Sequence, residues 1–202
     1  MDHATALDTI RGIHIVGLAL GLGLALYADF TALRFLVTPV RRAAPEELAR
    51  LHALVFAGLG MLWFSGLVLL TLRTGFDPGT ITPKLGAKLA VVLTLTANAL
   101  AIGDWALPAL RAEEGRPFAE WRRGLRLRLA LVAALSAASW GAALVLGTFA
   151  TTRAMDVGDL ALLLGAIYGG TLALCTALAL AAPALALLLA PADRGAVEPD
   201  PT

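Results

Sequence analysis

The chain has 202 residues, of which 58% are hydrophobic and only 15% are charged, and its mean hydropathy is +0.78. A composition this apolar excludes an ordinary soluble domain, which keeps much of its sequence polar to meet water. The formal net charge is +1 and no basic run with interleaved aromatic residues occurs, so nucleic-acid binding is not expected. The single cysteine, Cys175, excludes an intramolecular disulfide framework.

Long apolar runs separated by short charged stretches predict transmembrane helices, because a hydrocarbon core roughly 30 Å thick needs about 20 apolar residues per helix. Lipid cannot satisfy exposed backbone amides, and the runs lack the alternation of barrel strands. We therefore predict an all-α, polytopic integral membrane bundle of about five helices. Residues 1–190 should form one domain and residues 191–202 a polar tail, with spans at 13–37, 53–72, 85–107, 127–149 and 160–182.

The most informative polar residue of the first span is His14, whose helical face continues with small residues. An imidazole in a membrane helix can ligate haem iron or copper, relay a proton, or hydrogen-bond a neighbouring helix. A lone histidine near the end of a span is more often structural, so both interpretations stay open. His3 is a second metal candidate, because a histidine third from a free amine can complete a square-planar copper site.

Lys84 and Lys88 begin the third span at the depth of His14, and their spacing puts them on one helical face. An ammonium one turn into a membrane helix can simply extend to the lipid headgroups. Alternatively, Lys88 points inward beside His14, as an axial ligand once deprotonated or as a cation that holds an anionic group such as a haem propionate. The sequence leaves both alternatives open.

A second group of polar residues is expected in the other half of the bilayer. The costliest of them to bury is Asp29, which should face the protein interior against an arginine or His52. A structural ion pair is the default interpretation, and a proton or substrate path is the alternative. The predicted cluster comprises Asp29, Arg34, His52, Asn98 and Asp104.

Two further patterns concern helix packing. Gly17 and Gly21 repeat at four-residue spacing, which favours close packing within the bundle over a dedicated dimer interface. Pro183 falls late in the fifth apolar run, so the last helix should either kink or end there.

The orientation follows from the unequal distribution of basic residues. Under the positive-inside rule, the side richer in arginine and lysine faces the cytoplasm. This places the C-terminus in the cytoplasm and the N-terminus outside, in a membrane of the bacterial inner-membrane type. The richer side carries Arg34, Arg41, Arg42, Arg50, Arg111, Arg116, Arg122, Arg123, Arg126, Arg128 and Arg194, against Arg11, Arg73, Lys84, Lys88 and Arg153 on the other.

The run GAKLAVVLTLTANALAIGDWALPAL, residues 86–110, has a lysine early in a helix, an asparagine near its middle and a closing proline–leucine pair. It resembles the CopD-like family of copper-resistance membrane proteins. The first span, with His14 ahead of a glycine-rich stretch, is also similar to the related haem-binding, membrane-type protoporphyrinogen oxidases. The resemblance implies roles for a first-helix histidine and a third-helix lysine, which correspond here to His14 and Lys88. Asp104 departs from the CopD-like pattern, which tends to have an arginine there.

These observations lead to two main functional hypotheses. In the first, the bundle binds b-type haem or copper near its outer face through His14, with Lys88 and Lys84 nearby, for redox or metal handling. In the second, the chain is a non-catalytic membrane subunit or small transporter that packs with a partner protein or self-associates within the lipid bilayer. An enzyme acting on a porphyrinogen is implied by the resemblance alone.

Overall fold

The computed structural model describes residues 3–36 and 38–188, apart from the side chains of His3 and Pro78. The described chain is almost entirely helical and contains no strand. Five helices are long and apolar enough to cross a membrane, over Ala4–Arg34, Ala44–Thr74, Pro83–Ala112, Arg123–Thr148 and Val157–Leu188. The predicted all-α bundle of five membrane helices is therefore confirmed.

The helices are α1 (His3–Arg34), α2 (Ala44–Thr74), α3 (Pro83–Ala101), α4 (Leu107–Ala112), α5 (Arg123–Thr148) and α6 (Val157–Leu188). The π-helical turn η2 (Ile102–Ala106) joins α3 to α4, so the three elements form one span. Short 3-10 turns, η1 (Pro78–Thr80), η3 (Phe118–Glu120) and η4 (Ala150–Arg153), lie in the connections.

Local signals explain several helix ends. Thr82 caps α3 by accepting a hydrogen bond from the Leu85 amide at 3.3 Å, and Pro83 follows in the first turn. Gly75 ends α2 in the left-handed region with φ of 56°, where a side chain would be strained. α1 and α2 extend beyond the predicted spans because their polar end turns are also helical, and α6 extends to Leu188 because the helix continues through Pro183.

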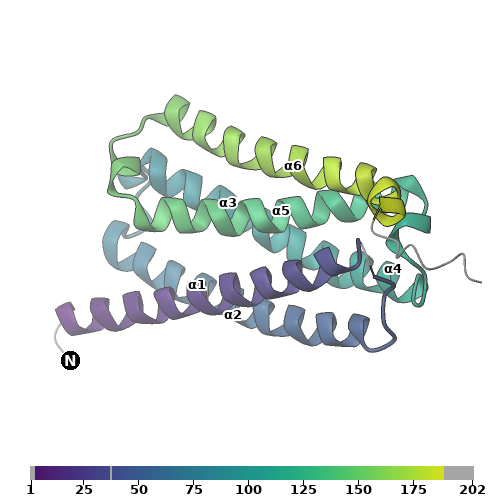
Figure 1. The fold of residues 1–202 in the computed structure, drawn as a ribbon. Coiled ribbons are helices and arrows are strands. Elements are labelled where there is room, and N and C mark those ends of the chain that lie inside the picture. Colours follow the sequence, from purple (N-terminus) through teal and green to yellow (C-terminus); the bar gives the residue numbers. More distant parts are fainter. Residues whose placement is uncertain (1–2, 37, 189–202) are drawn as a thin grey trace, which may run out of the picture.

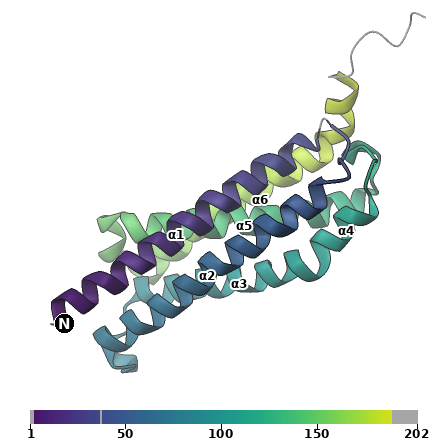
Figure 2. The ribbon, with the colours of Figure 1, turned by 90° about the horizontal axis from the view of Figure 1, so that it is seen from below.

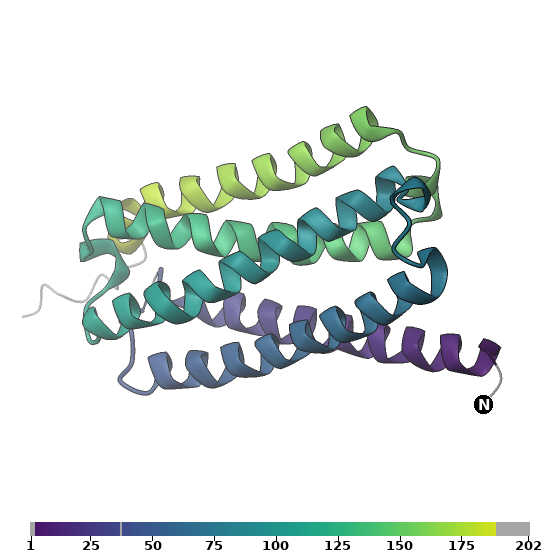
Figure 3. The same ribbon diagram turned by 180° about the vertical axis from the view of Figure 1, so that it is seen from behind.

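The helices pack as two antiparallel pairs with α3 between them (Figure 1). α1 packs chiefly on α2, and α5 packs on α6 and on α3. The view from below and the view from behind show α3 running along the bundle between α2 and α5 (Figures 2 and 3). α1 and α6 both pack on α5, and no comparable packing joins these two helices to each other.

Close approach of α1, α2 and α5 depends on glycines. A Cβ at Gly17 would lie 3.2 Å from the Gly58 carbonyl oxygen, and a Cβ at Gly58 would lie 3.0 Å from the Gly21 amide. A Cβ at Gly21 would overlap the indole of Trp140, which is 1% exposed. The expected packing role of Gly17 and Gly21 within the bundle is therefore confirmed.

The two ends of the bundle differ in their charged loops. At one end, named here the arginine end, the Gly115 amide donates to the Val40 carbonyl at 3.0 Å, and Arg42 pairs with Glu114 at 3.7 Å. These contacts join the α1–α2 and α4–α5 loops. At the other end, named the lysine end, Lys84 Nζ donates to the Phe149 carbonyl at 3.3 Å and joins the first turn of α3 to the α5–α6 connection. The arginine-rich loops thus share one end of the bundle.

Pro183 neither ends α6 nor lies beyond it, because the helix continues to Leu188. In Figure 1 the last, yellow turns of α6 are seen nearly end-on, whereas the preceding turns are seen from the side. α6 therefore bends near Pro183, as a proline inside a helix causes. The predicted tail over residues 191–202 lies outside the described residues.

Candidate functional site

His14 on α1 is held by a buried serine of α2. Its Nδ1 lies 2.9 Å from Ser65 Oγ, and Ser65 is fully buried. The same hydroxyl lies 2.6 Å from the Met61 carbonyl, which can only accept a hydrogen bond. Since Ser65 has one hydroxyl hydrogen, it donates to Met61 and accepts from Nδ1–H of His14. The neutral imidazole then carries its unshared electron pair on Nε2, the atom that a metal ligand of this kind uses.

Lys88 is the cation of the lysine end that acts on His14. The ammonium of Lys88 lies within electrostatic range of the His14 ring and of three other cations, Lys84, Arg73 and Arg153. We name Arg73, Lys84, Lys88 and Arg153 the lysine-end cluster. None of the four has an acidic partner within salt-bridge distance in the described part of the chain. The cluster therefore presents positive charge that no acidic residue of the described chain neutralises, and Lys88 links it to the imidazole, which suits an anionic group.

A copper site needs several convergent ligands, and the described residues do not provide them. Within residues 3–36 and 38–188, apart from the two side chains that are not described, no group of three His, Cys, Asp or Glu residues is placed to hold a metal ion. The proposed amine-terminal copper site depends on His3 and the two residues before it, and these lie outside the described side chains.

A cavity of about 380 Å³ lies in the half of the bundle nearer the arginine end. α1, α5 and α6 line it, together with residues of α2, η2 and α4, and nearly all of the lining is apolar. Leu33 of α1 and Leu174 of α6 belong to the lining and are 50% and 60% exposed. The cavity therefore opens sideways between α1 and α6, toward the surroundings that a bilayer would occupy.

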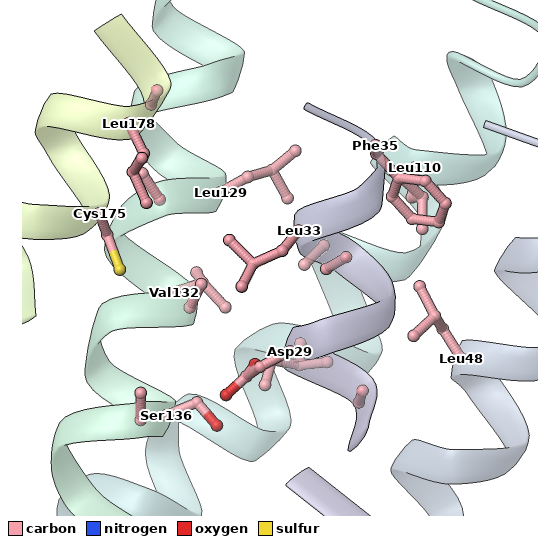
Figure 4. Close-up of a pocket in the computed structure, with 18 of the residues that line it drawn as sticks. Asp29, Leu33, Phe35, Leu48, Leu110, Leu129, Val132, Ser136, Cys175 and Leu178 are labelled. Carbon is pink, nitrogen blue, oxygen red and sulfur yellow. The ribbon is translucent and has the colours of Figure 1, made fainter. Parts of the chain in front are cut away.

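Asp29 is the acidic residue of this cavity. Figure 4 shows its carboxylate and the hydroxyl of Ser136 directed into the same space, with the Cys175 thiol on the α6 side. In the described chain, Asp29 has no hydrogen-bond partner and no ion pair. Among the described residues, the ion pair with an arginine or His52 that the sequence led us to expect does not form.

A second, smaller space adjoins the cavity, and we name it the side chamber. It has a volume of about 10 Å³, room for one water-sized group, and His52 and Ser136 line both spaces. Asn98 lines the side chamber and is 4% exposed. Its Nδ2 donates to the Val132 carbonyl at 3.1 Å, but its Oδ1 is buried without a partner in the described part of the chain.

His52 lies next to Gly103 of the π-helical turn η2. A Cβ at Gly103, inside this turn, would lie 3.4 Å from His52 Nε2, so the ring packs directly against the backbone. Such turns occur frequently at functional sites of helices.

The predicted cluster of Asp29, Arg34, His52, Asn98 and Asp104 is only partly assembled. Asp29, His52 and Asn98 line the two adjoining spaces, whereas Arg34 and Asp104 line neither. The guanidinium of Arg34 lies 4.8 Å from the Phe30 ring centroid, and Asp104 is exposed. The sequence analysis missed Ser65 and did not assign Cys175 to a cavity. A lone hydroxyl at the depth of His14, within an apolar run, is the signal that could have identified Ser65.

In comparisons with known proteins, no family model, no curated protein and no solved structure matches this chain.

Proposed function

We propose that this integral membrane protein binds b-type haem at its lysine end through His14, in the manner that its resemblance to the CopD-like family and the membrane-type protoporphyrinogen oxidases implies. The observation that carries the proposal is the hydrogen bond from His14 Nδ1–H to Ser65, which leaves Nε2 free to ligate iron. Orientation of a ligating histidine through its other nitrogen is the usual arrangement of metal sites.

The lysine-end cluster supports haem over copper. Haem needs one or two axial ligands and counter-ions for its two propionates, whereas a protein copper site needs several convergent ligands. Lys88 and its neighbouring cations supply the counter-ions, and Lys88 lies within electrostatic range of the imidazole. Bound haem would supply one-electron redox chemistry, while this chain's residues would hold the iron and neutralise the propionates.

The same proposal includes an orientation. The arginine-rich loops meet at one end of the bundle, so the positive-inside rule acts on that end as a whole. We place the arginine end in the cytoplasm, His14 near the outer face, and the protein in a bacterial-type inner membrane.

Visible absorption of the purified full chain, produced with added haem, tests the proposal. We expect a Soret band and about one haem per chain in the wild type, and loss of both in His14→Ala. The matched control is His52→Ala, which removes the imidazole at the other end and should leave the band unchanged. A Soret band that survives His14→Ala would contradict the assignment, and so would a wild-type chain without haem. Bound copper without a Soret band would favour the copper alternative.

A further inference from the structure

We propose that the cavity between α1 and α6 binds a membrane-dissolved amphiphilic amine, a molecule with an apolar body and a protonated amino head. The inference does not depend on haem, because His14 and the lysine-end cluster line neither the cavity nor the side chamber.

The size and lining of the cavity fit the apolar body. Pockets for small ligands have volumes of about 300–1,000 Å³ and are mostly apolar with a few placed polar groups. This cavity has about 380 Å³, and Leu33 and Leu174 at its sideways opening are half exposed or more. A ligand can therefore enter from the hydrocarbon layer without crossing water.

The polar groups of the cavity fit a cationic donor. A carboxylate at membrane depth is costly unless it is paired. No arginine or lysine lines the cavity, and in the described chain Asp29 pairs with none. An ammonium head at Asp29 would supply the missing charge, and Ser136, which faces the same space in Figure 4, can accept a second hydrogen bond.

Asn98 gives an independent indication of a donor. Its Oδ1 is buried and has no hydrogen-bond partner among the described residues, and leaving such an acceptor unpaired costs about 1–3 kcal/mol. The side chamber that it lines adjoins the cavity, and His52 and Ser136 line both spaces. Its volume accommodates one water-sized donor, so the polar end of this pocket offers acceptors on three helices, α1, α3 and α5. A head with several N–H donors satisfies more of them than a hydroxyl or a carbonyl does.

The reactivity of Cys175 can report whether a ligand occupies the cavity. It is the only cysteine of the chain, it lines the cavity, and its thiol lies within electrostatic range of Asp29. We would place the full chain in nanodiscs of phosphatidylcholine, whose bilayer has no net charge. Alkylation of Cys175 by N-ethylmaleimide would be followed by intact mass at increasing mole fractions of decylammonium or 1-decanol in the bilayer.

We expect half-protection of Cys175 at a roughly tenfold lower mole fraction of decylammonium than of 1-decanol, because hydrogen bonds to charged groups are the stronger ones. In Asp29→Asn the difference between the two ligands should disappear. The control chain is Cys175→Ser with Leu172→Cys, which puts the thiol on the same helix outside the cavity lining, at a 41% exposed position. Neither ligand should protect that thiol selectively.

Equal protection by the two ligands would overturn the proposal and indicate a site for acyl chains without recognition of a head group. Absence of protection by either ligand would also overturn it, as would a preference for the amine that persists in Asp29→Asn. If Asp29→Asn does not fold, the comparison of amine with alcohol on the wild-type chain decides alone.

Discussion

The lysine end and the cavity differ in the sign of their unpaired charge. In the described chain, the lysine end has cations without acidic partners, whereas the cavity has a carboxylate without a basic partner. At the lysine end, Arg73, Lys84, Lys88 and Arg153 lack acidic partners in the described chain. In the cavity and the side chamber, the Asp29 carboxylate and Asn98 Oδ1 have no hydrogen-bond donor among the described residues. Because the two regions lie in different halves of the bundle, their charges do not neutralise each other. One region suits an anion and the other a cation.

Removal of the Ser65 hydroxyl should have the largest effect of the changes proposed, and it acts at the lysine end. In Ser65→Ala the imidazole of His14 loses the acceptor that orients it, and we expect haem affinity to fall about 10–100-fold, as for other partners of ligating histidines. Haem titration monitored at the Soret band measures the change. Ser139→Ala is the control, since Ser139 is also fully buried but bonds Tyr168 at 2.8 Å. Equal haem affinity of Ser65→Ala and wild type would show that the hydrogen bond does not support ligation.

A methyl group at Gly21 should disturb both regions together. Gly21 lies about two turns from His14 and about two turns from Asp29 along α1. In Gly21→Ala the new Cβ meets the buried indole of Trp140, which also lines the side chamber, so we expect a loss of about 1–3 kcal/mol in the free energy of unfolding. Thermal unfolding in nanodiscs measures it. Gly23→Ala, where no atom lies within 4 Å, should show no loss, and equal effects at the two positions would contradict the packing argument.

Neutralising Asp29 should have the smallest effect, and its sign should be the opposite. In Asp29→Asn the unpaired charge is gone from the apolar cavity, so the ligand-free protein should gain about 1 kcal/mol, which raises the Tm by roughly 2–4 °C for a chain of this size. Asp104→Asn, at an exposed position outside the cavity, should leave the Tm unchanged. A lower Tm in Asp29→Asn would mean that the carboxylate has a stabilising partner and would weaken the cavity proposal.

The five helices were predictable because their apolar runs are long and the turns between them are charged. The shared end of His14 and Lys88 was also predictable, since both lie about one turn inside the same end of their spans. The hydrogen bond between His14 and Ser65 was not predictable, because a single serine in an apolar run does not indicate which helix it faces. Depth along the chain is readable from sequence, whereas the rotation of each helix about its axis is set by packing.

The difference between depth and helix rotation also explains why Arg34 and Asp104 do not join Asp29, His52 and Asn98. Five residues separate Asp29 from Arg34, and at 3.6 residues per turn their side chains diverge by roughly 140°. Asp29 therefore faces the cavity while Arg34 lies over Phe30 at the exposed face. Between Asn98 and Asp104, the π-helical turn adds a further change of register, and Asp104 faces outward. A sequence pattern that assumes an unbroken α-helix cannot anticipate this change.

Pro183 changes the backbone hydrogen bonding of α6 near the cavity. A proline has no amide hydrogen, so the carbonyl four residues earlier, that of Ala179, loses its helical donor. Ala179 is 3% exposed and belongs to the cavity lining. The break in the backbone hydrogen bonding of α6 thus lies at a turn that forms part of the cavity wall, and Pro183→Ala would restore the amide that this turn lacks.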